Sequence, residues 1–191
     1  MIQLSPVLRA IGRHKTAFAP IMSYKSNKKD VSWIDLSKNN SALLEIDFNQ
    51  EGAVSEYLEK ERKKRKAHYL WGGFNEHRVW YQRSNLFGSD RCIHLGIDIW
   101  ADAYAPVFAP LTGKVHSFQD NAGYGNYGPT IILEHFIDDN KFYTLYGHLS
   151  RASLESLSIG QEIAQGEKFT ELGPEEENGN WTPHVHFQAM A

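Results

Sequence analysis

The stretch Ile93-His94-Leu95-Gly96-Ile97-Asp98-Ile99-Trp100 decides how the second half of this chain folds. Isoleucine and tryptophan, which strands favour, make up half of it. Two ionisable side chains, His94 and Asp98, interrupt it four residues apart. On a continuous strand, residues at an even spacing point to the same face of the sheet. The stretch therefore predicts a strand over residues 93–100 with His94 and Asp98 on one side.

Short apolar runs of the same kind continue to the end of the chain, at residues 107–118, 130–136, 142–146 and 185–189. β-Branched and aromatic residues fill these runs, and segments with Gly, Pro, Asn and Asp separate them. Few windows with helical periodicity lie between them, so alternating strand and helix units are not expected. The pattern predicts a mainly β fold, with an antiparallel sheet or a barrel-like domain.

The first part of the chain has a different pattern. Residues 1 to about 50 show no clear period and predict irregular structure with one or two short elements. Residues 51–67 predict a helix, because Val54, Tyr57 and Leu58 fall on one face at helical spacing. The second half of this helix is strongly basic, which suits the negative end of the helix dipole.

The length of 191 residues suits one main domain with room for an additional segment. We place the boundary between residues 1–68, a small, mixed N-terminal extension with the basic helix, and residues 69–191, the β domain.

The bulk composition argues against several classes of function. The net charge of −3 gives no general attraction to nucleic acid or to a membrane surface. No stretch reaches the roughly 18 apolar residues that a membrane span requires. The first residues lack the features of a secretory signal, and the single cysteine, Cys92, excludes an intramolecular disulfide. We expect a cytoplasmic protein, or a cell-envelope protein if a signal sequence is missing here.

Three further histidines lie in apolar, strand-like surroundings. His148 follows Tyr146-Gly147, and the pair His184 and His186 lies in Pro183-His184-Val185-His186-Phe187. Zinc binds imidazole nitrogen and carboxylate oxygen, and catalytic zinc sites use three protein ligands and leave a position for water. Together with His94 and Asp98, these residues predict one zinc ion per chain. The other histidines, to which we assign no functional role, are His14, His68, His77, His116 and His135.

His135 ends the apolar run Thr130-Ile131-Ile132-Leu133. We expect its side chain to face solvent or to cap the strand.

Other kinds of site fit the sequence less well. A structural zinc site usually has four ligands, often cysteines, and Cys92 is the only cysteine. A cysteine nucleophile at Cys92 could use the nearby His94, but no third residue that would orient the pair is evident. A serine triad lacks its Gly-x-Ser-x-Gly motif.

With these residues identified, the chain resembles the lysostaphin-like zinc endopeptidases, which cleave peptidoglycan. The resemblance covers residues 91–190, and the matching segments occur in the family's order. These segments are His94 to Asp98, Ala105 to Val115, Gly123 to Tyr127, Tyr146 to Ser150, Ile159 to Gly166 and Pro183 to Gln188. The sequence departs from the family pattern at residues 178–182, which read Asn-Gly-Asn-Trp-Thr in place of the usual Gly-Ser-Thr lead-in.

The resemblance implies a role for each matching polar residue. It implies that His94, Asp98 and His186 bind zinc, that His148 and His184 are catalytic, and that Tyr124 contacts the substrate or the transition state. It also implies a zinc-dependent metalloendopeptidase whose substrate is a peptide link of peptidoglycan or a peptide derived from the wall. Which of the two catalytic histidines is the general base stays open.

The sequence also allows two other functions. The chain could be a non-catalytic scaffold or regulator that keeps the peptidase fold, although such proteins usually lose metal ligands and this chain keeps them. Residues 1–68 could also dock a partner or cover the cleft as an inhibitory segment.

Overall fold

The computed structural model describes residues 5–23, 30–48, 50, 52–78, 81 and 92–191. The N-terminal elements are α1 (Pro6–Arg13), β1 (Val31–Trp33), the 3-10 helix η1 (Ser41–Glu45), α2 (Ala53–Arg65), β2 (Tyr69–Gly72) and β3 (Glu76–His77). The C-terminal elements are β4 (Ile93–His94), β5 (Ile97–Trp100), β6 (Pro106–Phe108), β7 (Gly113–Asn121), β8 (Gly128–Ile137), β9 (Asn140–Gly147), α3 (Ala152–Glu155), β10 (Glu162–Ile163), β11 (Lys168–Glu171) and β12 (His184–Met190).

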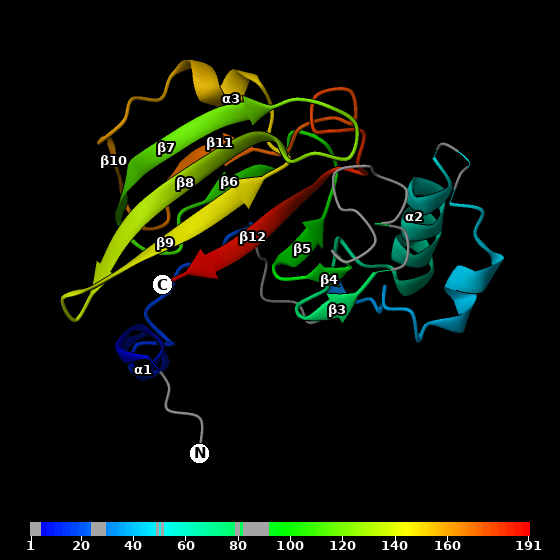
Figure 1. Ribbon diagram of the computed structural model, residues 1–191, viewed down its shortest axis with the longest axis horizontal. Coiled ribbons are helices and arrows are strands. Elements are labelled where there is room, and N and C mark those ends of the chain that lie inside the picture. Colours follow the sequence, from blue (N-terminus) through cyan, green and yellow to red (C-terminus); the bar gives the residue numbers. More distant parts are fainter. Residues whose placement is uncertain (1–4, 24–29, 49, 51, 79–80, 82–91) are drawn as a thin grey trace.

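A twisted eight-stranded sheet runs through the molecule in the order β1-β2-β5-β12-β9-β8-β7-β10 (Figure 1). All its neighbouring strands are antiparallel except β1 and β2, which are parallel. The mainly β, antiparallel fold predicted from the sequence is confirmed. The sheet is open, with β1 and β10 at its edges among the described strands.

A second, smaller layer lies behind the long strands. Strands β6 and β11 form a separate antiparallel pair, drawn behind β7, β8 and β9 in Figure 1. The main hydrophobic core contains Val107 of β6 and side chains of the large sheet such as Ile131, Leu133 and Tyr146. Burying these apolar side chains between the layers is the main source of stability for the fold.

The N-terminal part packs at the other end of the sheet, where α2 is the longest helix of the described residues (Figure 1). Leu58 of α2 shares a second hydrophobic cluster with Leu70 of β2 and Trp100 of β5. The predicted helix over residues 51–67 is confirmed from residue 53 to 65, and residue 51 lies outside the described residues. None of the described helices is long and apolar enough to cross a membrane.

Two of the predicted strands are interrupted in the structure. The strand predicted over residues 93–100 is divided at Leu95-Gly96 into β4, which pairs with β3, and β5, which pairs with β2 and β12. At the break Gly96 packs against His186, and a Cβ atom at this position would lie 2.4 Å from the His186 ring. The strand predicted over residues 107–118 is likewise divided into β6 and β7 around Pro110, which has no N–H group for a sheet.

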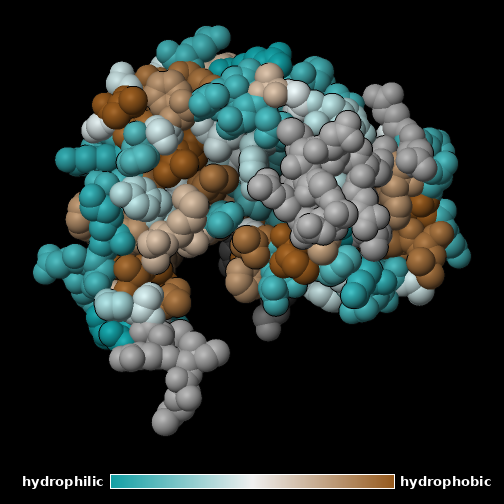
Figure 2. Space-filling model, viewed as in Figure 1, coloured by the Kyte–Doolittle hydropathy of each residue, from teal (hydrophilic) through white to brown (hydrophobic). Residues whose placement is uncertain are grey.

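Strand β1 extends the sheet from the N-terminal side. Its residue Trp33 lies opposite Trp71 of β2, and both side chains are substantially exposed. Figure 2 shows a hydrophobic area beside the β3–β4 pair. Phe74, two residues before β3, and Leu95, directly after β4, are exposed. The boundary between residues 68 and 69 stays a prediction, although β1 is hydrogen-bonded to a strand on the other side of it.

Candidate metal centre

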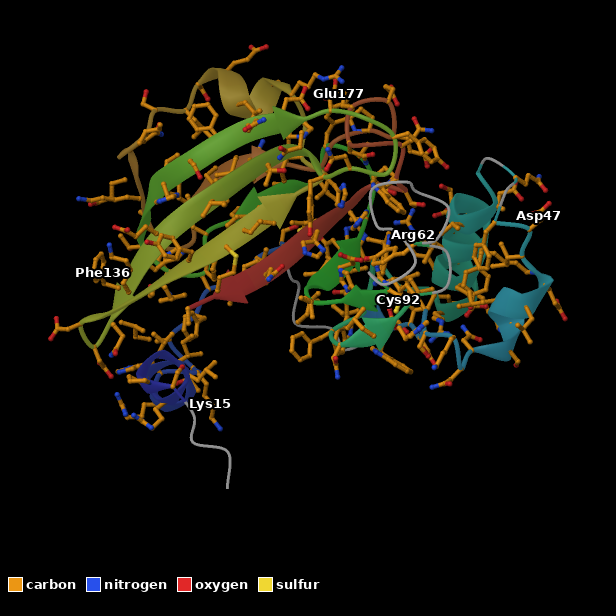
Figure 3. All side chains as sticks on the ribbon, viewed as in Figure 1. Lys15, Asp47, Arg62, Cys92, Phe136 and Glu177 are labelled. Carbon is orange, nitrogen blue, oxygen red and sulfur yellow. The ribbon has the colours of Figure 1, made fainter. Side chains whose placement is uncertain are left out.

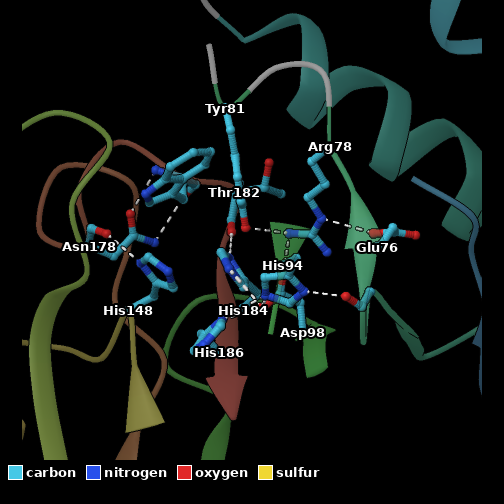
Figure 4. A network of polar contacts seen from close by, with 12 residues as sticks. Glu76, Arg78, Tyr81, His94, Asp98, His148, Asn178, Thr182, His184 and His186 are labelled. Carbon is cyan, nitrogen blue, oxygen red and sulfur yellow. Dashed lines mark hydrogen bonds and ion pairs between the residues drawn. The ribbon is translucent and has the colours of Figure 1, made fainter. Parts of the chain in front are cut away.

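Three side chains from three strands converge on one point (Figure 4). His186 of β12 lies directly opposite Asp98 of β5 in the antiparallel register, and His94 comes from β4. Nε2 of His94 lies 2.8 Å from Nδ1 of His186 and 3.2 Å from Oδ1 of Asp98. Nδ1 of His186 lies 3.1 Å from the same carboxylate oxygen. All three side chains are buried.

This donor set fits zinc in chemistry and in spacing. Two imidazole nitrogens and one carboxylate oxygen are typical zinc ligands. Among the described residues, His94, Asp98 and His186 form the group that could hold a metal ion. In a tetrahedral site with ligand bonds of about 2.0–2.1 Å, two ligand atoms are about 3.3 Å apart. The three separations are close to that value, and a fourth position is left for a water molecule.

The tautomer of His94 is fixed by a backbone contact. Its Nδ1 donates a hydrogen bond of 2.5 Å to the carbonyl oxygen of Gly73, which leaves Nε2 with a lone pair for the metal. Gly73 has φ +102°, and a Cβ atom there would lie 2.6 Å from Nδ1 of His94. Only glycine therefore allows the carbonyl group to approach the ring this closely.

The second oxygen of Asp98 is bound by a buried arginine. Arg78 Nη1 donates to Asp98 Oδ2 at 2.5 Å, and Arg78 Nε donates to Glu76 Oε2 at 2.9 Å. Glu76 Oε1 in turn accepts a hydrogen bond from the backbone of Leu36. Burial opposes ionisation of Asp98, but Arg78 and then His94 hold the pKa of Asp98 well below its usual range. The carboxylate is therefore ionised and has one oxygen directed at the histidines.

His148 lies beside this cluster in an uncommon backbone conformation. Its φ is +63°, in the left-handed region that favours glycine, and strain of this kind is concentrated at functional sites. The backbone N–H of His148 donates to the carbonyl oxygen of Tyr127, which holds the turn in place. Nδ1 of the ring donates to the carbonyl oxygen of Asn178 at 2.9 Å, so Nε2 keeps its lone pair.

His184 has the same kind of support. Its Nδ1 donates to the carbonyl oxygen of Thr182 at 2.6 Å, and its ring centre lies 4.3 Å from that of His148. Burial is the main cause that lowers the pKa of His148 well below its usual value, and it lowers the pKa of His184 to about 4 against the effect of Asp98. Both imidazoles are neutral at pH 7 and can accept a proton.

The two tyrosines of the glycine-rich loop are placed differently. Tyr124, for which the sequence predicts a substrate contact, is 58% exposed and is not among the described residues that line the cleft. Tyr127 does line the cleft, and its ring is stacked 5.7 Å from the ring of His148. Burial and, to a smaller extent, the charge of Asp98 raise the pKa of Tyr127, so its hydroxyl stays protonated. The role of Tyr124 stays a prediction.

The five polar residues predicted from the sequence all line one cleft of about 580 Å³. The reasoning that His94 and Asp98 share one strand was wrong, because they come from β4 and β5. They still converge, with Nε2 of His94 lying 3.2 Å from Oδ1 of Asp98, and Gly96 between the two strands packs against His186. Cys92 is outside the metal-binding group, and its carbonyl oxygen accepts a hydrogen bond from the backbone of Arg78.

Sequence reasoning missed Glu76 and Arg78. Glu76 begins the two-residue strand β3, and Arg78 directly follows it. The surrounding sequence shows no clear hydrophobic period. The sequence shows only two ionisable residues shortly after Gly72-Gly73. An ordinary surface turn has the same pattern, so it does not indicate a functional role. It also missed Tyr127, although the loop Gly123-Tyr124-Gly125-Asn126-Tyr127 offers two tyrosines.

Comparison with known proteins gives a family and several similar structures. The model of peptidase family M23 matches residues 92–191. A zinc-containing peptidase from Vibrio cholerae is 27% identical over 62% of this chain and 32% of that chain, with a TM-score of 0.46. The catalytic domain of the antimicrobial peptidase lysostaphin from Staphylococcus simulans is 26% identical over 64% of this chain and 80% of that domain, also with a TM-score of 0.46.

The chain thus spans about a third of the length of the Vibrio cholerae protein. A search of curated proteins gives no significant match. The family match covers more than half of the chain and includes the three residues placed to hold a metal ion, and the chain belongs to peptidase family M23.

Proposed function

We propose that this protein is a zinc-dependent metalloendopeptidase that hydrolyses peptide bonds. The observation that carries the proposal is the convergence of three zinc-type ligand atoms beside two neutral histidines in one cleft. His94, Asp98 and His186 would hold the ion, and His148 and His184 would handle protons. Membership of a peptidase family supports the same assignment.

Zinc, when bound, acts as a Lewis acid that polarises the scissile carbonyl and lowers the pKa of water toward 7. The protein must then accept the proton of the attacking water and deliver a proton to the leaving amine. His148 suits the first task, because its Nδ1–H is held by Asn178 and its Nε2 is free to accept a proton. His184, held in the same way by Thr182, can accept that proton as well, and the histidine that accepts it then carries the proton that the leaving amine needs.

The developing oxyanion also needs a donor. A protonated histidine or the Tyr127 hydroxyl could donate to it, because the raised pKa of Tyr127 keeps that hydroxyl protonated. Such preorganised donors are worth about 2.7–4 kcal/mol each in hydrolases of other types.

The proposed substrate is a peptide of peptidoglycan or a fragment derived from it. The likeness of residues 91–190 to the lysostaphin-like peptidases supports this class, and the antimicrobial peptidase lysostaphin is among the similar structures. Tyr124, exposed near the cleft-forming residues Gly125 and Asn126, is proposed to contact the part of the substrate that lies outside the cleft.

A scaffold that keeps only the fold is the alternative. A scaffold has no need for ionised Asp98 or for two buried imidazoles that are each held in one tautomer. Each of these groups has a buried partner that orients it, and both imidazoles keep Nε2 for proton transfer, which supports an enzyme.

The experiment compares wild-type protein with His94→Ala after zinc loading and gel filtration. We expect one zinc per chain by elemental analysis in the wild type and less than a tenth of that in the variant. The wild type should release amines from peptidoglycan fragments, and the variant should not. Wild-type protein that takes up no zinc, or that hydrolyses neither wall fragments nor other peptides, would contradict the proposal.

A further inference from the structure

The cleft extends beyond the metal centre into an apolar region that the N-terminal part of the chain helps to build. Val54 and Leu58 of α2 and Leu36 line the same cavity as the histidines. From the C-terminal part, Trp100 and Trp181 line it as well. We call the region formed by these five side chains the apolar wall.

The apolar wall begins directly at the catalytic histidines. The ring of Trp100 is stacked on His184, with ring centres 5.5 Å apart and planes 27° apart. Trp181 approaches His148 edge-on, with ring centres 6.0 Å apart. Its indole N–H donates to the carbonyl oxygen of Asn126 at 3.0 Å, which fixes the ring. A peptide whose scissile bond lies at the metal would therefore place a neighbouring side chain near these rings.

Helix α2 is connected to this side of the cleft by hydrogen bonds and an ion pair. Ser55 Oγ donates to Glu175 at 2.7 Å and lies 2.7 Å from Oγ1 of Thr182, the residue whose carbonyl group holds His184. At the other end of the helix, Arg62 pairs with Asp102 at 2.7 Å. Figure 3 shows Arg62 on the side of α2 that faces the sheet. These contacts fix the position of Val54 and Leu58 relative to the metal centre.

The charges around the cavity favour an apolar occupant. Among the described residues that line it, the groups charged at neutral pH are Arg78 and Asp98, and they are paired with each other. A charged side chain entering the apolar wall would lose its hydration without gaining a partner. An aliphatic or aromatic side chain would gain from leaving water.

We propose that the apolar wall is a specificity subsite for an aliphatic or aromatic side chain next to the scissile bond of the substrate peptide. This inference rests on the proposed peptidase function. Val54, Leu58 and Leu36 lie outside residues 92–191, which match the family model, so the subsite depends on a part of this chain that the family match does not include. Residues 1–68 then contribute to substrate selection.

The test measures binding separately from hydrolysis. Zinc-loaded full-length protein with His148→Ala is titrated by calorimetry with capped peptides Gly-Gly-X-Gly-Gly, in which X is Gly, Leu, Phe or Lys. We expect the Leu and Phe peptides to bind at least tenfold more tightly than the Gly and Lys peptides. Adding Val54→Asp should reduce this ratio to less than threefold. Asp is suited to that position, because Val54 lies in the first turn of α2.

A matched control places the same side chain elsewhere on the helix. Lys60 is exposed on α2, and Lys60→Asp should keep the tenfold ratio. Leu58→Ala, which enlarges the cavity without adding charge, should shift the preference from Leu toward Phe. Equal binding of all four peptides, or a ratio that Val54→Asp leaves unchanged, would overturn the subsite.

Hydrolysis of the same peptides by protein with intact His148 distinguishes the two proposals. Binding that depends on X without hydrolysis would overturn the peptidase function and leave the subsite. Hydrolysis at equal rates for all four peptides would leave the function and overturn the subsite.

Discussion

Arg78 holds the carboxylate of Asp98 from the side opposite to His94 and His186. Its Nη1 donates to Oδ2, while Oδ1 lies 3.2 Å from Nε2 of His94 and 3.1 Å from Nδ1 of His186. A carboxylate that is fixed by an outer hydrogen bond presents one oxygen to a metal in a defined direction. Because Arg78 is positively charged, it also keeps Asp98 ionised when no metal is bound.

Replacing Arg78 with Leu should strongly destabilise the metal-free protein. The change leaves Asp98 and Glu76 as buried carboxylates without their arginine partner. Removing one member of a buried ion pair costs about 3–5 kcal/mol. Urea unfolding in the presence of a chelator measures this loss. Lys63→Ala, which breaks an exposed pair with Glu59, is the control and should change the midpoint little. Equal midpoints for Arg78→Leu and wild type would show that Arg78 does not stabilise Asp98.

Gly96→Ala should weaken zinc binding without removing a ligand. A Cβ atom at Gly96 would lie 2.4 Å from the ring of His186, so the ring has to shift from its present position. Mutations of the residues that orient a metal ligand typically cost about 10- to 100-fold in metal affinity. Competition with a chromogenic chelator gives the affinity. Gly12→Ala adds the same methyl group where no atom lies within 4 Å, so it should bind zinc as the wild type does.

His148→Ala should abolish hydrolysis and leave zinc bound. His148 lies outside the group of metal-binding atoms, and its free Nε2 is the proposed proton acceptor. Loss of a general base lowers the rate by about 10²- to 10⁴-fold. The measurement combines peptide turnover with elemental analysis of the same sample. A variant that loses its zinc would make His148 a ligand, and the roles would have to be reassigned.

Acid should destabilise the protein in part through His135, which is not among the described residues that line the cleft. Burial lowers the pKa of His135 below the value of about 6.5 expected for an unfolded chain. The unfolded state therefore binds a proton first, and stability is lost as the pH falls below about 6.5. Unfolding free energies between pH 7 and pH 5 should fall less in His135→Gln than in the wild type. His116→Gln, at an exposed position of β7, should follow the wild type.

The sequence was sufficient to predict the β fold, the helix over residues 53–65 and the five residues that meet in the cleft. Polar residues placed among apolar, strand-like residues are a local signal, because such residues are expensive to bury without a function. The interruption at Leu95-Gly96 was not predicted. Gly96 at this break packs against the ring of His186, which is 90 residues further along the chain, so the contact leaves no local signal in the sequence.

The position of His135 was also not predictable from its neighbours in the sequence. It was expected to face solvent or to cap a strand, but its side chain is buried and the expectation was wrong. Its Nδ1 donates to the carbonyl oxygen of Thr112, and its Nε2 lies 2.7 Å from Oγ1 of Thr144. Both hydrogen-bond partners lie in other segments of the chain. The residues next to His135 in the sequence therefore do not indicate that its ring nitrogens have buried hydrogen-bond partners.

The pairing of β1 with β2 has a consequence for how the protein can be shortened. Strand β1 covers one edge of β2, and β2 borders β5, the strand that holds Asp98. A fragment that begins at residue 69 would expose the N–H and C=O groups of that β2 edge, with Leu70 and Trp71 in the same strand. An uncovered edge of this kind is a template for pairing with a second molecule and for aggregation. A soluble minimal fragment should therefore begin before Val31, well upstream of the residues that carry the chemistry.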